Sequence, residues 1–439
     1  MLTVLIFLSV YVGGFIHSLA GNPATAFMLY QIVYFMHPQM RWWGELVPDI
    51  SYSFFVVLLM LGMFAANFSR FNKNSFFEVP QFKWIFLVCG LFIISGLYAV
   101  FPDRHGQALV YFIKLVVIIC VAYKVIDTTK TFNGSLYAYI AGAAYIGLLT
   151  YQSGRNSGDR VEGVGTIDSP ESNGIAVAIA PAAIIALYYL WVSKKNSVRF
   201  GMLMAGALIA NALVLINSRG AILATFVGGG YFLGNLYFSK LQRKNQKRNT
   251  LLLVVLGLCG VLLLLDETAV NRLKTLTTTE IRTDEPSEKE SGATRLYFWI
   301  AAIDMAKDYP FGLGYKGFQA KAPDYIPVDV HTGGSRYRSV HSTWFQALTE
   351  IGYLGLFCFL AMLFSCFRAT NKCKQQLFSL DNFDDYFKII SIEAGLLTYM
   401  VGMSFMNRMT AEVLFWLILF TACAYNIYVL KPQEKLRKA

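Results

Sequence analysis

Long apolar runs, separated by short polar segments, follow one another along most of the chain. A helix needs roughly 20 apolar residues to cross a bilayer. Runs of that kind lie near 50–69, 82–101, 107–126, 173–192, 200–217, 220–239, 250–266, 344–367, 388–406 and 410–430. A shorter run near 135–151 is also expected to cross, and the two short runs in residues 1–37 leave open whether both do. The pattern predicts an all-α polytopic membrane protein with about 12 or 13 transmembrane helices.

The longest interruption of the apolar pattern is the polar segment 267–343. It divides the chain into N-terminal transmembrane helices (1–266), a large loop (267–343), and C-terminal transmembrane helices with a tail (344–439). Inside the loop, apolar residues recur at helical spacing, at Leu296, Trp299, Ile300 and Ile303. This period predicts an amphipathic helix that lies on the membrane surface or on the helix bundle.

Composition supports a membrane protein. Of 439 residues, 56% are hydrophobic and only 15% are charged, and the mean hydropathy of +0.48 is too high for a water-soluble surface. Met1 to Phe15 lacks a basic start and a clear cleavage site, so we interpret it as a retained segment and not as a signal peptide. All seven cysteines fall in apolar runs or in the basic loop after Phe367, which disfavours disulfides and cysteine metal sites.

The formal net charge of +11 reflects short basic segments between the apolar runs. Cytoplasmic loops of membrane proteins are enriched in Lys and Arg, and the basic segments here alternate with the runs in one phase. They lie at 194–199, 240–248, 368–374 and 431–438. Placing them in the cytoplasm puts 151–172, 218–220, 267–343 and 407–410 outside, which is the periplasm of a bacterium. Topology therefore explains the basic charge without a nucleic-acid partner.

Nearly all positive charge in the outside segments is Arg, not Lys. Arg forms planar, bidentate contacts with phosphate oxygens, so the pattern indicates an anionic, lipid-anchored ligand. Arg155, Arg282 and Arg408 are more simply solvated loop residues. Arg295 lies in the first turn of the expected amphipathic helix, where anions are favoured; contact with lipid headgroups is an equal alternative. The outside arginines are Arg155, Arg160, Arg219, Arg282, Arg295, Arg336, Arg338 and Arg408.

His341 differs in its surroundings from the other histidines, which are His17, His37, His105 and His331. The apolar run that begins at Trp344 follows it almost at once, so His341 should lie at the mouth of the bundle. A neutral imidazole there could accept a proton near neutral pH, although a lone histidine is more often structural. The others are most simply interfacial or, for His331, part of a flexible loop.

Several further patterns have simple explanations. The glycines of G-x-G-x-x-G at 312–317 follow a helical stretch and not a strand, so we interpret them as a helix stop and a tight turn, not a dinucleotide site. The acidic run 381–385 is interpreted as solvated charge. Glu45 and Asp49 lack the close spacing of an acidic metal-binding pair, which favours metal-independent chemistry. Lys114 and Glu393 lie within apolar runs, where charge indicates pairing or function, but no signal links them.

Several segments, in their order along the chain, resemble the bacterial O-antigen ligase, O-antigen polymerase and O-glycosylation ligase superfamily. The sequence M-H-P-Q-M-R-W near the N-terminus is similar to the O-glycosylation ligase subgroup, and 163–174 is similar to the family's segment before a middle span. The more specific segments are S-R-G-A (218–221), A-T-R-L-x-x-W (293–299), P-F-G-L-G (310–314) and H-S-x-x-x-Q-x-L-x-E-x-G (341–352).

The resemblance implies an inverting, metal-independent glycosyltransferase with a membrane fold of the C type and no cofactor. It implies transfer of a glycan from undecaprenyl diphosphate to an acceptor hydroxyl at the periplasmic face of the bacterial inner membrane. His341 would be the base, and Arg219 and Arg295, with Arg160, would bind the diphosphate. Glu350 and Arg338 are candidates for supporting roles.

The acceptor stays open between a lipid A core sugar, a protein hydroxyl, and another lipid-linked repeat, which would make the protein a polymerase. A transporter or flippase of lipid-linked glycans is a rival from another class. It would require charges near the bilayer midplane and matching halves with interrupted helices, and the chain has few such charges and no obvious internal repeat.

Overall fold

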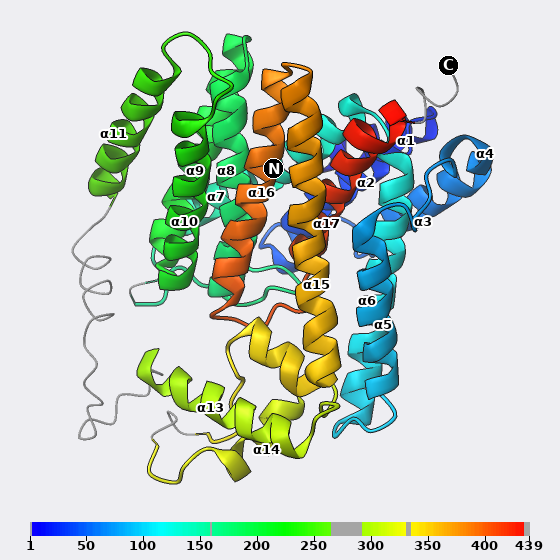
Figure 1. Cartoon of the computed structure of the whole chain (residues 1–439), viewed down its shortest axis with the longest axis vertical. Coiled ribbons are helices and arrows are strands. Elements are labelled where there is room, and N and C mark those ends of the chain that lie inside the picture. The colour runs from blue at the N-terminus through cyan, green and yellow to red at the C-terminus, as the bar shows by residue number, and fades with distance from the viewer. Residues whose placement is uncertain (1, 159, 265–291, 331–334, 434–439) are drawn as a thin grey trace.

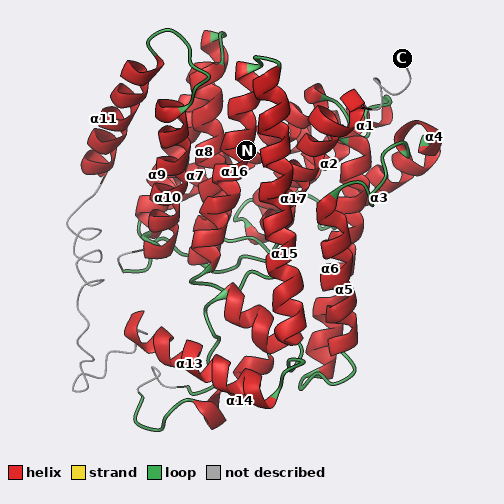
Figure 2. Ribbon diagram, in the orientation of Figure 1, coloured by secondary structure: helices red, strands yellow, loops and turns green. Residues whose placement is uncertain are grey.

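The computed structural model describes residues 2–158, 160–264, 292–330 and 335–433 and is helical almost throughout that part (Figures 1 and 2). Its α-helices are α1 (Leu2–Leu19), α2 (Ala24–Met36), α3 (Tyr52–Ala66), α4 (Phe68–Phe71), α5 (Pro80–Ser95), α6 (Pro102–Val125), α7 (Thr129–Ser153), α8 (Ser172–Val192), α9 (Asn196–Ile216), α10 (Arg219–Phe238), α11 (Gln246–Leu264), α13 (Gly292–Asp308), α14 (Gly317–Tyr325), α15 (Thr343–Ser379), α16 (Phe383–Met403) and α17 (Glu412–Tyr425), continued by the π-helix η3 (Asn426–Leu430). No strand occurs among the described residues, which confirms the all-α class.

Six of the described helices are long and apolar enough to cross a membrane, and three more are apolar but shorter. The long ones are α6, α8, α9, α10, α15 and α17 with its extension; the short ones are α1, α3 and α5. α2 has 13 residues, or about 20 Å of helix, which is less than the roughly 30 Å hydrocarbon core. The chain is thus a multi-pass membrane protein, and 12 or 13 crossings remain a prediction.

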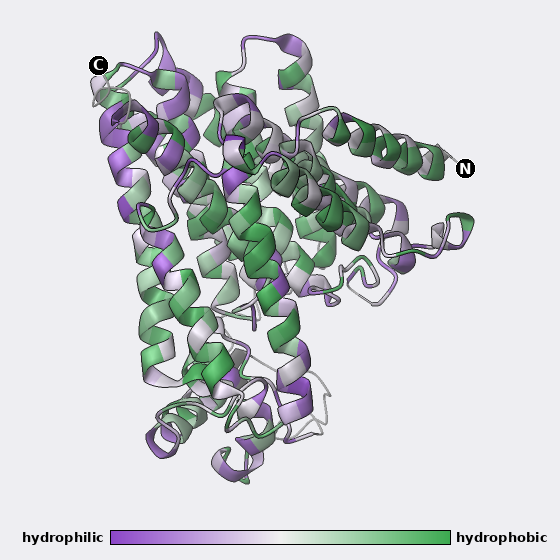
Figure 3. Ribbon diagram, turned by 90° about the vertical axis from the view of Figure 1, so that its right-hand side faces the viewer, coloured by the Kyte–Doolittle hydropathy of each residue, from purple (hydrophilic) through white to green (hydrophobic). Residues whose placement is uncertain are grey.

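The connections of the bundle separate into two ends. The α10–α11 and α15–α16 connections lie at one end, whereas α13 and α14 lie at the other (Figure 1). Hydrophilic residues gather toward both ends, and the middle of the bundle is mainly hydrophobic (Figure 3). This arrangement agrees with the phase in which the basic segments alternate with the apolar runs.

α13 and α14 build a small core of their own below the bundle. Phe298, Ala301, Ala302 and Met305 form the buried face of α13, and Trp299 stacks on Phe345 of α15 with ring centroids 5.7 Å apart. The amphipathic helix is therefore present, but of the expected apolar stripe Trp299 packs on the protein and the three other residues do not. The larger residues Leu296, Ile300 and Ile303 are 56%, 48% and 44% exposed, because the small alanines let the opposite face approach the protein closely.

The P-F-G-L-G turn docks into a break in α15. Gly352 has a non-helical φ of 71°, so the preceding carbonyls lose their partners within the helix and accept from the turn instead. Leu313 N donates to Thr349 O (2.8 Å), and Tyr353 N donates to Pro310 O (3.0 Å). The turn also bonds to α6, since Tyr315 N donates to His105 Nδ1 (3.0 Å). The interpretation of this stretch as a tight turn is confirmed.

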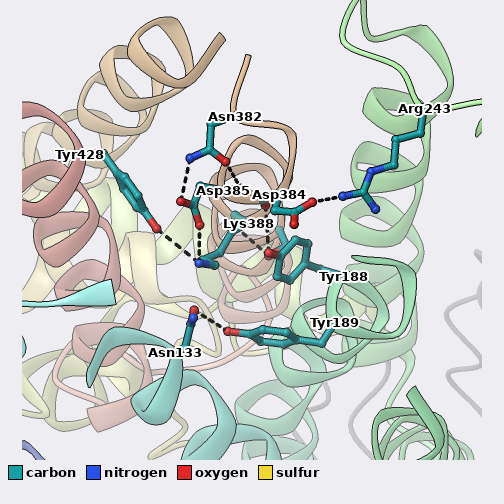
Figure 4. A network of polar contacts seen from close by, with 10 residues as sticks. Asn133, Tyr188, Tyr189, Arg243, Asn382, Asp384, Asp385, Lys388 and Tyr428 are labelled. Atoms are coloured by element: carbon teal, nitrogen blue, oxygen red, sulfur yellow. Dashed lines mark hydrogen bonds and ion pairs between the residues drawn. The ribbon is translucent and has the colours of Figure 1, made fainter. Parts of the chain in front are cut away.

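Buried charges elsewhere are paired within the protein. Glu393 on α16 forms an ion pair with Lys374 of α15 at 2.7 Å, a partner that the sequence does not indicate. The acidic run before and in the first turn of α16 is not simply solvated. Asp385 pairs with Lys388 (2.6 Å) and Asp384 pairs with Arg243, so this end of α16 is fixed to the α10–α11 connection (Figure 4).

Candidate functional site

The connection between α16 and α17, residues 404–411, holds the beginning of α15 in place. Ser342 N donates to Asn407 Oδ1 (3.2 Å), and Thr343 Oγ1 donates to Met406 O (2.7 Å) while accepting from Arg408 N (2.9 Å). Further hydrogen bonds run from Trp344 Nε1 to Ser404 Oγ (2.8 Å) and from Met409 N to Gln346 Oε1 (3.2 Å). The first turn of α15 is therefore held by side chains and backbone of this connection.

His341 is the residue immediately before this fixed turn. It is partly buried, and its backbone has a φ of 51°, in the left-handed region. A residue other than glycine is uncommon there and is held by its surroundings, often at functional sites. The structure thus places His341 at the mouth of the bundle, as the sequence predicts, and fixes its backbone.

Phe405 of the same connection brings two of the candidate arginines together. Arg295 in the first turn of α13 reaches Phe405 O with Nη1 at 3.5 Å. The ring of Phe405 packs against Gly220, where a Cβ atom would lie 3.1 Å from it. Gly220 follows Arg219, the first residue of α10. Phe405 is also two residues from Asn407, whose side chain accepts the hydrogen bond of Ser342 beside His341.

Arg160 completes a group of three guanidinium groups. Arg219 lies within electrostatic range of both Arg295 and Arg160, although the three arginines come from α10, α13 and the α7–α8 connection. Arg160 donates through Nη2 to Asn173 Oδ1 in the first turn of α8, and Nη1 lies 4.0 Å from Glu162. Like charges at short range repel, so this arrangement suits an anion between them.

Glu350 is buried further along α15, beyond its fixed first turn. Its Oε1 accepts from Lys316 N (3.0 Å) and from Gln346 Nε2 (3.3 Å). It lines a cavity of about 10 Å³ together with Gln346 and Asn407, which is room for about one water molecule. Glu350 therefore joins α14 to α15. The other supporting candidate, Arg338, is partly buried on the segment that leads to His341.

Arg408 and Arg41 are two buried arginines that are not among the site residues predicted from the sequence. Arg408 is only 7% exposed, so its interpretation as a solvated loop residue is wrong. Arg41 donates to Phe35 O (2.9 Å) and Gly165 O (3.0 Å), holding the α7–α8 connection against α2. The sequence predicts the outside position of Arg408 but not its burial. Arg155 is partly buried, and Arg282 and His331 lie outside the described residues.

The candidate site combines three neighbouring arginines with a histidine that precedes the turn held by the α16–α17 connection. Among the residues that the structure describes, no group of three or more His, Cys, Asp or Glu is placed to hold a metal ion. Guanidinium groups stabilise phosphate charge directly, and an imidazole accepts protons near neutral pH. The side chains present suit displacement of an anionic leaving group with removal of a proton.

Residues 204–360 match a family model described as O-antigen ligase. This match covers less than half of the chain and supports the O-antigen ligase/polymerase superfamily. The matched segment contains Arg219, Arg295, His341 and Glu350, whereas Arg160 lies before it. No curated protein matches the chain.

Proposed function

We propose that this protein is a member of the O-antigen ligase/polymerase superfamily and a glycosyltransferase that moves a glycan from undecaprenyl diphosphate to an acceptor hydroxyl at the outer face of the inner membrane. The observation that carries the proposal is the convergence of Arg160, Arg219 and Arg295 beside the connection that holds the start of α15. Such a group fits a diphosphate that reaches the protein from the membrane. The proposal extends to a metal-independent, inverting reaction.

The leaving group is the first chemical requirement of this reaction. When the bond between the sugar and the diphosphate breaks, negative charge develops on the diphosphate, and fixed guanidinium groups stabilise it best where water is excluded. Arg219 and Arg295 lie in the first turns of α10 and α13, and Arg160 contacts the first turn of α8. The free N–H groups at helix starts favour anions as well.

Proton removal is the second requirement. In the proposed step the acceptor oxygen forms a bond to the anomeric carbon, undecaprenyl diphosphate departs with the electrons of the broken bond, and His341 takes the hydroxyl proton. One displacement of this kind inverts the anomeric configuration. The fixed backbone of His341 would hold the imidazole for this role.

The proposed transferase could be a ligase or a polymerase, and these two differ in the class of acceptor. A ligase transfers to a lipid A core sugar or to a protein hydroxyl, and a polymerase transfers to another lipid-linked repeat. Cells that lack the protein should lose one glycoconjugate and accumulate lipid-linked glycan, and the lost product names the acceptor. In proteoliposomes, labelled undecaprenyl-diphosphate glycan should become covalently joined to that acceptor. Movement of the label across the membrane with no new covalent bond would contradict the proposal and favour a transporter.

A further inference from the structure

Two neighbouring residues in the first turn of α8 contact the two halves of the candidate site. Asn173 accepts a hydrogen bond from Arg160, one of the three clustered arginines. Gly174 packs against the guanidinium group of Arg408 so closely that a methyl group at this position would overlap Nη2. The start of α8 is therefore in contact with the arginine group on one side and with the α16–α17 connection on the other.

Arg408 is buried where it crosses between these elements. Its Nη1 donates to Asp168 O in the connection before α8. The side chain of Asp168 is itself held, because Oδ2 accepts from Glu412 N at 2.9 Å and Oδ1 accepts from Tyr34. Burying a guanidinium group costs free energy unless its contacts compensate. An arginine retained in this place is thus expected to have a specific task.

The backbone at Arg408 is joined to the turn that follows His341. Arg408 N donates to Thr343 Oγ1 (2.9 Å), and the adjacent Asn407 accepts from Ser342 N (3.2 Å). His341 has left-handed backbone geometry, which persists only where the surroundings impose it. The side chain of Arg408 therefore links the position of His341 to the α8 turn that also holds Arg160.

We propose that Arg408, seated on Gly174, is a positioning residue that sets His341 at the right place relative to the arginine group. The proposal rests on the proposed function, since it takes His341 as the base and the arginines as the diphosphate site. Arg408 acts through the backbone of residues 407 and 408 and does not itself touch the substrate. Loss of Arg408 should therefore lower the rate of transfer while the affinity for the diphosphate stays nearly unchanged.

The test compares Arg408→Lys and Gly174→Ala with the matched control Gly206→Ala. Gly206 lies in α9 with open space around it. Lysine keeps the charge but loses the planar guanidinium that lies on Gly174, and alanine at 174 displaces that group. We expect both variants to lower kcat for transfer about tenfold or more and to bind undecaprenyl diphosphate within about twofold of wild type, as for a group that acts on the transition state. Gly206→Ala should match wild type in both.

A double variant separates this mechanism from simple destabilisation. If Gly174 is needed only to seat Arg408, then Gly174→Ala should cost little further activity in an Arg408→Ala background, so the two changes are strongly non-additive. Wild-type transfer in Arg408→Lys and Gly174→Ala, additive losses, or loss of undecaprenyl diphosphate binding in parallel with transfer would each overturn the proposal. Parallel loss would assign Arg408 to the diphosphate site instead. If Arg408→Lys fails to accumulate in membranes, Gly174→Ala alone tests the proposal. The same two quantities are then compared, kcat for transfer and affinity for undecaprenyl diphosphate.

Failure of the proposed function gives a different result. In that case wild-type protein itself neither transfers glycan nor binds undecaprenyl diphosphate, and no variant comparison arises. Failure of the positioning role instead leaves wild-type transfer intact and shows only in the variants.

Discussion

At the scale of single residues, His341 has the clearest expected effect. His341→Ala removes the group proposed to accept the hydroxyl proton, and such catalysis is typically worth roughly a hundred-fold to ten-thousand-fold in rate. We expect transfer to fall by about that factor while undecaprenyl diphosphate still binds, and lipid-linked glycan to accumulate in cells. Initial rates and binding of the purified variant measure this. Near wild-type transfer at neutral pH would move the base to another group.

The arginine group has a geometric requirement as well as a charge requirement. Arg219→Lys and Arg295→Lys each keep a positive charge but lose the planar fork that contacts two phosphate oxygens. A charge-assisted hydrogen bond contributes about 1.5–3 kcal/mol, which corresponds to roughly a tenfold to hundredfold loss of transfer. Transfer rates and undecaprenyl diphosphate affinity should both fall. Arg199→Lys, on the opposite side of the bundle at the start of α9, serves as the control, and full activity in both site variants would rule out the assigned contacts.

Residue types could be predicted from the sequence better than residue environments. The apolar runs indicate that His341 lies at the outer start of a helix and which arginines lie outside. The resemblance to the superfamily then selects Arg160, Arg219 and Arg295 among those arginines. The burial of Arg408 could not be predicted, because it depends on Gly174, which is far away in the chain and leaves space for the guanidinium. The ion pair between Glu393 and Lys374 could not be predicted either, because it depends on how α15 and α16 pack against each other.

At the scale of elements, the break in α15 at Gly352 is where the turn between α13 and α14 binds to the bundle. Gly352 has positive φ, and a side chain there would overlap Pro310 O and approach Phe311 of the docked turn. Gly352→Ala should destabilise this attachment by about 1–3 kcal/mol. We expect a lower Tm and faster proteolysis within 292–330, whereas Gly62→Ala, which has open space in α3, should show neither. If Gly352→Ala left Tm and proteolysis unchanged, the attachment of the turn would not depend on the non-helical backbone at residue 352.

α13 shows that the sequence predicts a helix more easily than it predicts which residues the helix packs against. The helix itself follows from periodic apolar residues, but α13 has apolar residues on both faces. The stripe of larger residues is the stronger sequence signal, yet the face with Ala301 and Ala302 is buried. Close approach favours small side chains, and periodicity alone does not report which face meets the protein.

At the scale of the whole molecule, the proposed chemistry should not depend on a metal ion. The candidate site offers three arginines and a histidine for charge stabilisation and proton removal, so no step requires a bound cation. Transfer by purified protein should therefore continue in EDTA at the untreated rate. Loss of transfer in EDTA that magnesium or manganese restores would contradict this, and assays with excess of each ion provide the control for chelator effects on the membrane.

The two ends of the bundle give the last prediction. The α10–α11 connection and the first turn of α11 carry five basic residues, Lys240, Arg243, Lys244, Lys247 and Arg248. The insertion bias assigns such a segment to the cytoplasm. α13 and α14 lie at the opposite end (Figure 1), so they and residue 328, which follows α14, should face the periplasm together with His341. Val328 and Lys244 are both exposed, and a cysteine at either should be reachable from its own side.

In intact cells with permeabilised outer membranes, a maleimide that does not cross the inner membrane should label Val328→Cys and not Lys244→Cys. After the inner membrane is opened, both should react. The native cysteines are measured in the parent protein as background, since Cys259 is exposed on α11. Labelling of Lys244→Cys alone in intact cells would reverse the orientation. The arginine group and His341 would then face the cytoplasm, away from the periplasmic acceptor hydroxyl that the reaction needs, and the proposed reaction would have to be abandoned.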